Sequence, residues 1–282
     1  MGVLLLLALL PGCVYHLKED QLIRPRPAPA VALDVLATAY PDYRIEAGHI
    51  PAADGASLAT LRLTRPDARA TVLYFGGNGY RIGLHAGHSA TAYRDVPVNL
   101  VLVDHRGYGG STGTPTTEAL MADALHVYDH FRADTASAGM PLLVHGQSLG
   151  SFMAGHVAAQ RRLDGLVLES STTTAEDWAR DMRSKGSLWM RLAIRRIDIA
   201  PPLRRFGNQG VVATLEAPVL FVVGANDQTT APGFSRTLYE ATPLPEGRKR
   251  LLVVPDRSHD NASRSPEFTD AMQAFVAQVA SG

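Results

Sequence analysis

The sequence predicts an α/β fold, a doubly wound and mostly parallel sheet with a short helical cap. Short apolar runs and amphipathic segments alternate from about residue 43 to residue 280. Continuous apolar runs of this kind are typical of parallel strands buried on both faces, and the segments between them repeat apolar residues at helical spacing. One long segment, at about residues 172–212, interrupts the alternation. Strands and helices in regular alternation indicate a sheet covered by helices on both faces.

Eight segments account for the predicted strands. The two earliest, residues 43–50 and 57–64, alternate apolar and polar residues in part. The other six are continuous apolar runs, at residues 71–77, 99–105, 141–146, 163–170, 218–224 and 250–255. We expect helices between them, for instance over residues 116–131 and 149–160, and a last helix over residues 267–280. Ligands of such sheets bind beyond the carboxyl ends of the strands, so we expect the chemistry at that edge.

The composition narrows the classes of function. Lysine plus arginine number 27 and aspartate plus glutamate also number 27, so the formal net charge is zero. Binding to nucleic acid phosphates needs a net basic field or a clear basic stripe, so the composition argues against nucleic acid as a partner. Cys13 is the single cysteine, which excludes an intramolecular disulfide.

The start of the chain indicates a targeting segment. Residues 1–12 read MGVLLLLALLPG, an apolar run too short to span a bilayer but suited to a signal peptide. LPGC at residues 10–13 resembles a bacterial lipobox, in which cleavage precedes a cysteine that carries lipid. The resemblance implies lipidation of Cys13 and anchoring to a membrane of the bacterial cell envelope. Pro11 and the lack of a preceding basic residue depart from the pattern. The alternative is an uncleaved, N-terminally anchored chain or a cytoplasmic one.

Two segments stand apart from the regular alternation. Residues 21–30 alternate proline with small or basic residues. Because proline fixes φ and lacks an N–H, we expect a lipid-anchor site and extended tether over residues 13–30, followed by a folded domain over residues 31–282. The segment of about residues 172–212 is too long for a simple connection and holds both tryptophans and many basic residues. We expect it to form a helical cap over the active edge.

A candidate nucleophile lies between the predicted strand at 141–146 and the helix that follows it. Gly146-Gln147-Ser148-Leu149-Gly150 fits the pattern G-x-S-x-G in the strand-turn-helix setting that a nucleophile elbow requires. The two glycines let the backbone turn sharply and let helix and strand approach. We therefore predict that Ser148 is a nucleophile held at a helix N-terminus. The alternative is a structural turn with a capping serine.

A serine hydroxyl needs a histidine base and an acid that orients the histidine. Asp227 follows the predicted strand at 218–224, and His259 follows the strand at 250–255. Both lie at carboxyl ends of strands, in the order serine, acid, histidine, so we predict that they complete a triad with Ser148. Glu169 and Asp177, which follow an earlier strand, are the alternative acids.

The sequence also offers an oxyanion hole. GGNGY at residues 76–80 follows an apolar strand, and its glycines allow the backbone to approach a substrate carbonyl. We predict that the backbone N–H groups of Asn78 and of Leu149, the residue after the nucleophile, donate to the oxyanion. The alternative is a plain glycine-rich turn.

Together these motifs resemble the α/β-hydrolase superfamily over nearly all of residues 43–280. The resemblance is strongest to the small-capped branch that includes protein depalmitoylases and related bacterial esterases. That branch has an HGN-type sequence where this chain has Gly76-Gly77-Asn78, and an RGYG-S-G-P pattern that DHRGYGGSTGTP at residues 104–115 fits. The resemblance implies a structural role for the second loop, so Arg106 and Tyr108 are not expected to be catalytic.

Two other sets of residues have weaker functional interpretations. His85 and His88 have a spacing that suits metal ligands, but no third ligand is evident, and we expect them to be structural or to line the pocket. We predict no metal and no organic cofactor. The basic cap residues are expected to form a solvated helical face, with anionic lipid headgroups as the alternative: Arg180, Arg183, Lys185, Arg191, Arg195 and Arg196.

The sequence thus predicts a serine hydrolase that cleaves a carboxylic ester or thioester of a small-molecule or acylated substrate through an acyl-enzyme. An acyltransferase or a peptidase on the same triad is one alternative, because the triad does not reveal the acceptor. A binding lipoprotein that keeps the fold without catalysis is the other, because a fold alone does not specify activity.

Overall fold

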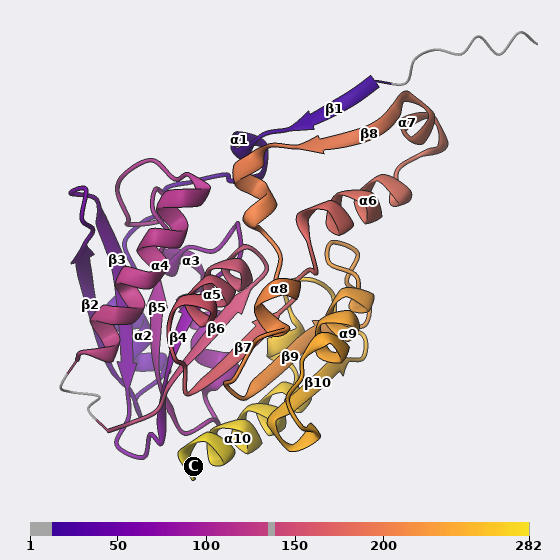
Figure 1. The fold of residues 1–282 in the computed structure, drawn as a ribbon. Coiled ribbons are helices and arrows are strands. Elements are labelled where there is room, and N and C mark those ends of the chain that lie inside the picture. The colour runs from indigo at the N-terminus through magenta and orange to yellow at the C-terminus, as the bar shows by residue number, and fades with distance from the viewer. Residues whose placement is uncertain (1–12, 135–138, 282) are drawn as a thin grey trace, which may run out of the picture.

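The computed structural model describes residues 13–134 and 139–281. Its centre is an eight-stranded sheet in the order β10-β9-β7-β6-β4-β5-β3-β2 (Figure 1). The strands are β2 (Arg44–Pro51), β3 (Ser57–Thr64), β4 (Ala70–Phe75), β5 (Val98–Val103), β6 (Leu142–Gln147), β7 (Gly165–Glu169), β9 (Val219–Gly224) and β10 (Lys249–Val254). β3 is antiparallel to β2 and β5, and the other neighbours are parallel. The predicted doubly wound, mostly parallel sheet is confirmed, with one strand in each predicted segment.

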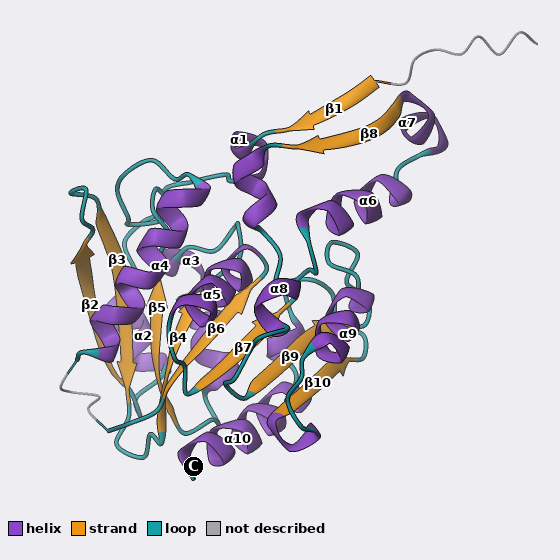
Figure 2. Cartoon of the chain, viewed as in Figure 1, coloured by secondary structure: helices purple, strands orange, loops and turns teal. Residues whose placement is uncertain are grey.

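Helices cover both faces of the sheet (Figure 2). They are α2 (Leu33–Ala39), α3 (Ile82–Tyr93), α4 (Thr117–Arg132), α5 (Leu149–Gln160), α8 (Gln209–Val212), α9 (Pro232–Ala241) and α10 (Pro266–Ala280). Helices α4 and α10 begin after Thr116 and Ser265, whose side chains accept a backbone N–H of the first turn. This capping stabilises each helix start by about 1 kcal/mol.

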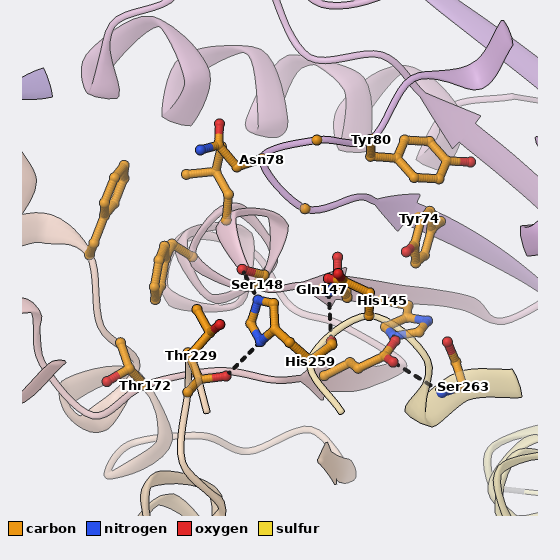
Figure 3. Close-up of a pocket in the computed structure, with 18 of the residues that line it drawn as sticks. Tyr74, Asn78, Tyr80, His145, Gln147, Ser148, Thr172, Thr229, His259 and Ser263 are labelled. Carbon is orange, nitrogen blue, oxygen red and sulfur yellow. Dashed lines mark hydrogen bonds and ion pairs between the residues drawn. The ribbon is translucent and has the colours of Figure 1, made fainter. Parts of the chain in front are cut away.

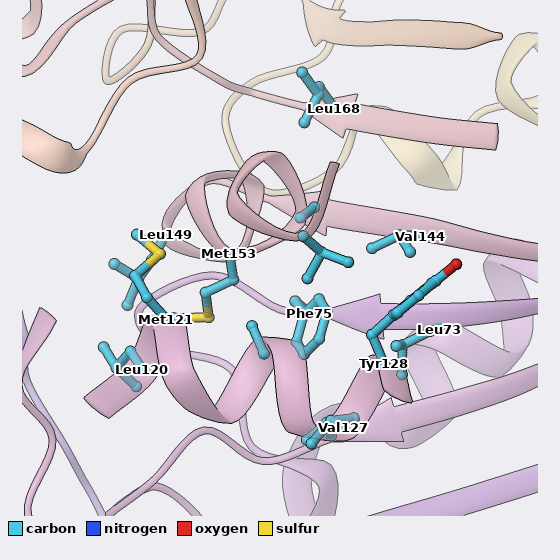
Figure 4. Packing of buried hydrophobic residues seen from close by; sticks show 14 of the residues in the cluster. Leu73, Phe75, Leu120, Met121, Val127, Tyr128, Val144, Leu149, Met153 and Leu168 are labelled. Carbon is cyan, nitrogen blue, oxygen red and sulfur yellow. The ribbon is translucent and has the colours of Figure 1, made fainter. Parts of the chain in front are cut away.

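The core has two layers because side chains alternate along each central strand. In β4, Leu73 and Phe75 belong to one buried cluster, together with α4 and α5, as Figure 4 shows. Val72 and Tyr74 belong to the other cluster, which α3 and α10 cover. Each fully buried aliphatic or aromatic side chain contributes roughly 1.5–3 kcal/mol, so these two layers fix the sheet and the loops at its carboxyl edge.

The segment predicted as a helical cap contains helices and one strand. It comprises α6 (Ala175–Lys185), α7 (Leu188–Ala193), β8 (Ile194–Ile199) and the 3-10 helix η2 (Pro201–Arg205). Strand β8 pairs in parallel with β1 (Cys13–Leu17), which lies outside the main sheet. The isoleucines of IRRIDI favour a strand, and β1 provides its partner. Figure 1 shows this two-stranded arm projecting from the body of the domain, with α7 at its outer end.

The N-terminal segment follows the surface of the domain. The predicted signal peptide, residues 1–12, lies outside the described residues. After β1 comes the short helix α1 (Glu19–Leu22), and the next residue, Ile23, is buried. The proline-rich part is extended, as expected, yet the N–H of Gly109 donates to the carbonyl of Arg26 at 2.9 Å. An extended backbone has unpaired carbonyls, and here the loop after β5 supplies a donor.

The described residues also bear on membrane spanning. Among their helices, none has the length and apolar character needed to cross a bilayer.

Candidate active site

Ser148 lies on a sharp turn between β6 and α5. Its φ of 52° and ψ of −115° fall in a region that side chains with a Cβ rarely adopt. The N–H of Ser148 donates to the carbonyl of Glu169 in β7 at 2.9 Å, and Ser151 donates back to the carbonyl of Ser148. Because the surrounding hydrogen bonds hold this strained backbone, the hydroxyl projects from the carboxyl edge of the sheet.

The two glycines of the motif are needed for close backbone packing. A Cβ on Gly146 would lie 2.2 Å from the carbonyl oxygen of Gly150, and a Cβ on Gly150 would lie 2.0 Å from that of Phe75. Both distances are far shorter than any real contact. The turn therefore brings the start of α5 directly against the end of β4, as the sequence pattern predicts.

The three predicted triad residues lie together at the edge of the sheet. His259 Nε2 is 2.8 Å from the Ser148 hydroxyl, and His259 Nδ1 is 2.9 Å from Asp227 Oδ2. Asp227 is buried, whereas the His259 side chain remains 16% exposed toward the pocket. One histidine thus connects a buried carboxylate to a half-buried hydroxyl, the arrangement by which a base is oriented toward a nucleophile.

The charges of Asp227 and His259 stabilise each other. Burial raises the pKa of the Asp227 carboxyl, but the hydrogen bond and charge of His259 and the donors of Thr230 lower it by more, so that this pKa lies below its ordinary value. Burial lowers the pKa of the His259 imidazole, but the hydrogen bond and charge of Asp227 raise it by more, so that it lies above its ordinary value. The site therefore favours a carboxylate beside an imidazole that readily takes a proton.

Several residues that the sequence does not single out hold the three predicted triad residues in place. The N–H groups of Thr229 and Thr230 both donate to Asp227 Oδ1 at 2.8 Å, and the Thr230 hydroxyl contacts Asp227 Oδ2 at 2.9 Å. Gln147 Nε2 donates to the His259 carbonyl at 3.2 Å (Figure 3). Hydroxyl and amide side chains directly after a candidate acid or before a candidate nucleophile are the only signal that the sequence offers for them.

The loop after β4 lies over the nucleophile. A Cβ on Gly77 would lie 2.3 Å from Gln147 Oε1 and 3.4 Å from Ser148 Cβ, so a side chain here would displace the Gln147 amide that holds the His259 loop. Asn78 and Leu149, the two predicted oxyanion donors, line the same pocket as Ser148. In Figure 3 the Asn78 amide points away from Ser148. The donor that Asn78 can offer a substrate is therefore its backbone N–H.

The Asn78 side chain fixes that loop through two distant segments. Its Oδ1 accepts hydrogen bonds from the Tyr108 hydroxyl at 2.6 Å and from the Arg24 N–H at 3.1 Å. Its Nδ2 donates to the Leu22 carbonyl at 2.5 Å. The RGYG loop and the N-terminal segment therefore both buttress the predicted oxyanion loop. Arg106 is likewise structural, because it forms a bidentate ion pair with the buried carboxylate of Asp123.

The glycine at position 76, where related branches have histidine, also has a physical basis. A Cβ there would lie 2.1 Å from the Tyr80 ring, so the ring takes the space of any side chain. The Gly76 carbonyl faces His105 Nε2 at 2.7 Å. Tyr80 and His105 thus hold the turn that precedes Asn78.

The alternative acids lie elsewhere. Glu169 is fully buried, with Oε2 3.2 Å from His145 Nε2, and the Ser263 N–H donates to its Oε1 at 3.1 Å. Asp177 lies in the first turn of α6, where it contacts the Thr173 hydroxyl and Arg180. Neither carboxylate makes a hydrogen bond to His259 among the described residues, whereas Asp227 does.

A cavity of about 560 Å³ opens beside Ser148. Its cap side is apolar and is lined by Leu17, Leu22, Leu149, Phe152, Trp178, Ile199, Leu203 and Phe206. Its other side carries polar and aromatic groups from Tyr74, Tyr80, His85, His88, Glu169, Asp260, Ser263 and Arg264. In Figure 3, Ser148 and His259 lie between Thr172 and Thr229 on one side and Tyr80, Tyr74 and His145 on the other. Volume and lining suit a small amphiphilic ligand.

His85 and His88 both line this cavity, with ring centroids 6.1 Å apart. The described residues contain no group of three or more side chains placed to hold a metal ion. Burial lowers the pKa of His85, which favours its neutral form.

The chain is similar in sequence to proteins of a yeast and of a monkey. The chain is 26% identical over 237 residues to an uncharacterized membrane protein of Saccharomyces cerevisiae, covering 79% of this chain and 76% of that protein. It is 29% identical over 231 residues to the lysophosphatidylserine lipase ABHD12 of Macaca fascicularis, covering 74% of this chain and 56% of that protein. The chain therefore spans just over half the length of this lipase.

Solved structures share the architecture. The esterase Pf2001 of Pyrococcus furiosus superposes with a TM-score of 0.65 at 16% identity, over 90% of this chain and 96% of that one. An acetyl xylan esterase of Thermoanaerobacterium superposes with a TM-score of 0.62 at 14% identity, over 94% and 99%. These likenesses establish the fold.

Sheet order, elbow and the geometry around Ser148 define an α/β hydrolase. Residues 66–209, just over half of the 282 residues, match the family described as serine aminopeptidase, S33, and the chain belongs to that family of hydrolases. The predicted superfamily and the prediction that the chain is a hydrolase are confirmed.

Proposed function

We propose that this hydrolase cleaves a carboxylic ester or thioester through Ser148, His259 and Asp227. The observation that carries the proposal is the continuous chain of short contacts from the buried Asp227 carboxylate through His259 to the Ser148 hydroxyl. A hydroxyl so placed at the end of a strained turn is activated by the base beside it.

In this mechanism His259 Nε2 takes the proton of Ser148 as its Oγ attacks the substrate carbonyl carbon. The backbone N–H groups of Asn78 and Leu149 stabilise the oxyanion that forms. Asp227 stabilises the imidazolium, which then protonates the leaving alkoxide or thiolate. A water molecule that gives its proton to His259 attacks the acyl-enzyme, and Ser148 leaves with that proton restored.

The pocket supports an amphiphilic substrate. Its apolar cap side suits the acyl chain, while the opposite side offers His85, His88 and Arg264 to a polar or anionic alcohol part. The relative named as a lysophosphatidylserine lipase supports the same class, an ester that joins one fatty chain to a charged head. We therefore propose esters of this amphiphilic type as the substrate class.

Labelling with a fluorophosphonate probe tests the assignment. Wild-type protein should be labelled, and Ser148→Ala should lose the label entirely. Ser148→Ala and His259→Ala should each lower the turnover of a p-nitrophenyl acyl ester by on the order of 10⁴- to 10⁶-fold. Circular dichroism checks that each variant is folded. Unlabelled, folded wild-type protein would instead favour the binding lipoprotein, and turnover that persists in either variant would contradict the triad.

We also propose that Cys13 carries lipid and anchors the chain in the bacterial cell envelope. Cys13 is exposed at the outer end of β1, where a modifying enzyme has access to it. Metabolic labelling with an alkyne fatty acid should mark the wild type and not Cys13→Ser. An unlabelled wild-type protein that keeps residues 1–12 by mass spectrometry would support the uncleaved N-terminus instead.

A further inference from the structure

We infer that the outer end of the cap is a membrane-docking surface that inserts into an anionic lipid bilayer. This surface, here called the docking tip, consists of α7 with Val14 and Tyr15 of β1. The inference goes beyond the proposed reaction and does not depend on catalysis.

Exposed large apolar side chains gather at this tip. Trp189 is 79% exposed, Leu188 66% and Leu192 62%. Met190, Val14 and Tyr15 are exposed beside them, and every residue from 187 to 193 is exposed. Scattered apolar residues on a surface need no explanation, but a contiguous group of this size marks a site that another apolar phase covers.

Hydrogen bonds at both ends of α7 fix the docking tip within the fold. The Ser187 hydroxyl accepts the N–H of Met190 and caps the start of α7. Arg183 of α6 donates through Nε to the Ile194 carbonyl at 2.6 Å and through Nη2 to the Arg191 carbonyl at 3.1 Å, which satisfies the end of α7. These contacts hold the helix in place although its apolar side chains stay exposed on the part of the domain that the structure describes.

Charge favours lipid over a second protein copy as the occupant. Between Asp181 and Asp198 the chain has no acidic residue, and it has five basic ones: Arg183, Lys185, Arg191, Arg195 and Arg196. Among the described residues, Arg191 and Arg195 make no ion pair with a carboxylate. Basic residues beside an apolar face complement anionic headgroups, whereas two copies of this tip would repel each other.

The start of the chain reaches the same place. Cys13 pairs with Ile194, the first residue after α7, in the parallel register of β1 and β8. The apolar run of residues 3–10 precedes it in sequence. If Cys13 carries lipid, as proposed, or if the apolar run is retained as an anchor, the attachment point lies at the outer end of β1 beside the docking tip, and the two together would give the several signals that stable attachment requires.

The arm also relates the membrane to the pocket. At the inner end of the two strands Leu17 pairs with Ile199, and both line the pocket. Four residue steps at about 3.3 Å separate Leu17 from Cys13 along β1, so the pocket rim at this pair lies about 13 Å from the outer end of the strand, beside the end of α7. Insertion of α7 would therefore hold the pocket entrance close above the headgroups.

Collisional quenching tests insertion directly. The chain has two tryptophans, so the full chain carrying Trp178→Phe reports on Trp189 alone. With vesicles of phosphatidylglycerol and phosphatidylcholine that carry brominated acyl chains, Trp189 emission should shift to the blue and be largely lost. Leu188→Ser/Leu192→Ser in that background should abolish the quenching. A matched control, Val35→Ser/Leu84→Ser, removes two apolar side chains that are 62% and 49% exposed elsewhere and should leave it unchanged.

Two results would overturn the inference. Unquenched Trp189 emission in protein that still sediments with vesicles would mean that the N-terminus alone holds the chain at the membrane. A dimer in vesicle-free buffer that dissociates in Leu188→Ser/Leu192→Ser, without quenching by lipid, would identify a second copy as the occupant. The same measurements on Ser148→Ala should match the wild type, so failure here is separate from failure of the proposed reaction.

Discussion

The carboxyl edge of the sheet and the two-stranded arm use similar residues for opposite purposes. Strand β9 reads VLFVVG and is wholly buried, and the proposed acid, Asp227, lies three residues after its end. Helix α7 reads LWMRLA and is wholly exposed. The apolar side chains of β9 already have partners in the core, so they stabilise the fold and fix Asp227. Those of α7 are exposed, so they gain little burial from the part of the domain that the structure describes.

The charged side chains of the two regions also differ in whether they are buried with fixed partners or exposed. Asp227 is buried with four neighbouring donors, and its position relative to His259 is therefore determined by the fold. Arg195 and Arg196 are exposed on the arm. Buried charges need fixed partners, whereas exposed ones interact with whatever surface approaches. The comparison therefore agrees with the proposed chemistry in the first region and with the proposed attachment through the second.

Replacing Asp227 is expected to have the largest effect on activity in the first region. Asp227→Asn should lower turnover by about 10⁴-fold, because the neutral amide neither fixes the His259 tautomer nor stabilises the imidazolium. It should also shift the pH profile. Activity needs neutral His259, so it falls as the pH drops through the pKa of His259, which Asp227 raises. Without that carboxylate, the acid limb of kcat/KM should move to lower pH.

Asp177→Asn is the matched control for this test, because it removes a carboxylate that hydrogen-bonds to cap residues instead. It should leave both the rate and the acid limb near those of the wild type. A pH profile of Asp227→Asn that keeps the acid limb of the wild type would show that another group is the titrating base.

Much of the first region could be predicted because its signals are local and ordered. Each strand is a short apolar run, and the residues that follow the strands meet at one edge by the rule of parallel sheets. That rule, together with the elbow motif around Ser148 and the order serine, acid, histidine, brought Ser148, Asp227 and His259 into one prediction. Thr230 was missed because a hydroxyl three residues after an acid has no distinctive pattern until the loop folds around the carboxylate.

The arm was not predicted because its contacts join distant parts of the chain. His16 and Asp198, 182 residues apart, face each other at 3.2 Å across β1 and β8. The segment of residues 194–199, IRRIDI, has basic residues typical of a helical face. It forms a strand because it pairs with β1, which lies far away in the sequence. The same holds for Asn78, whose side chain is fixed by Leu22 and Arg24 from the segment expected to be a tether.

The two regions should also differ in how much their apolar side chains contribute to the free energy of unfolding. Phe221→Ala in β9 removes a side chain that is 0% exposed, and it should lower the free energy of unfolding by about 3–5 kcal/mol. Trp189→Ala removes a larger side chain from α7, yet it should change that free energy by less than about 0.5 kcal/mol, because no packing is lost. Urea denaturation without lipid measures both. If Trp189→Ala cost as much as Phe221→Ala, the tryptophan would have a partner within the fold, and neither the contrast between the regions nor the docking tip would stand. Equal stability of Trp189→Ala and wild type would show that the tryptophan does not stabilise the fold, which the proposed docking tip requires.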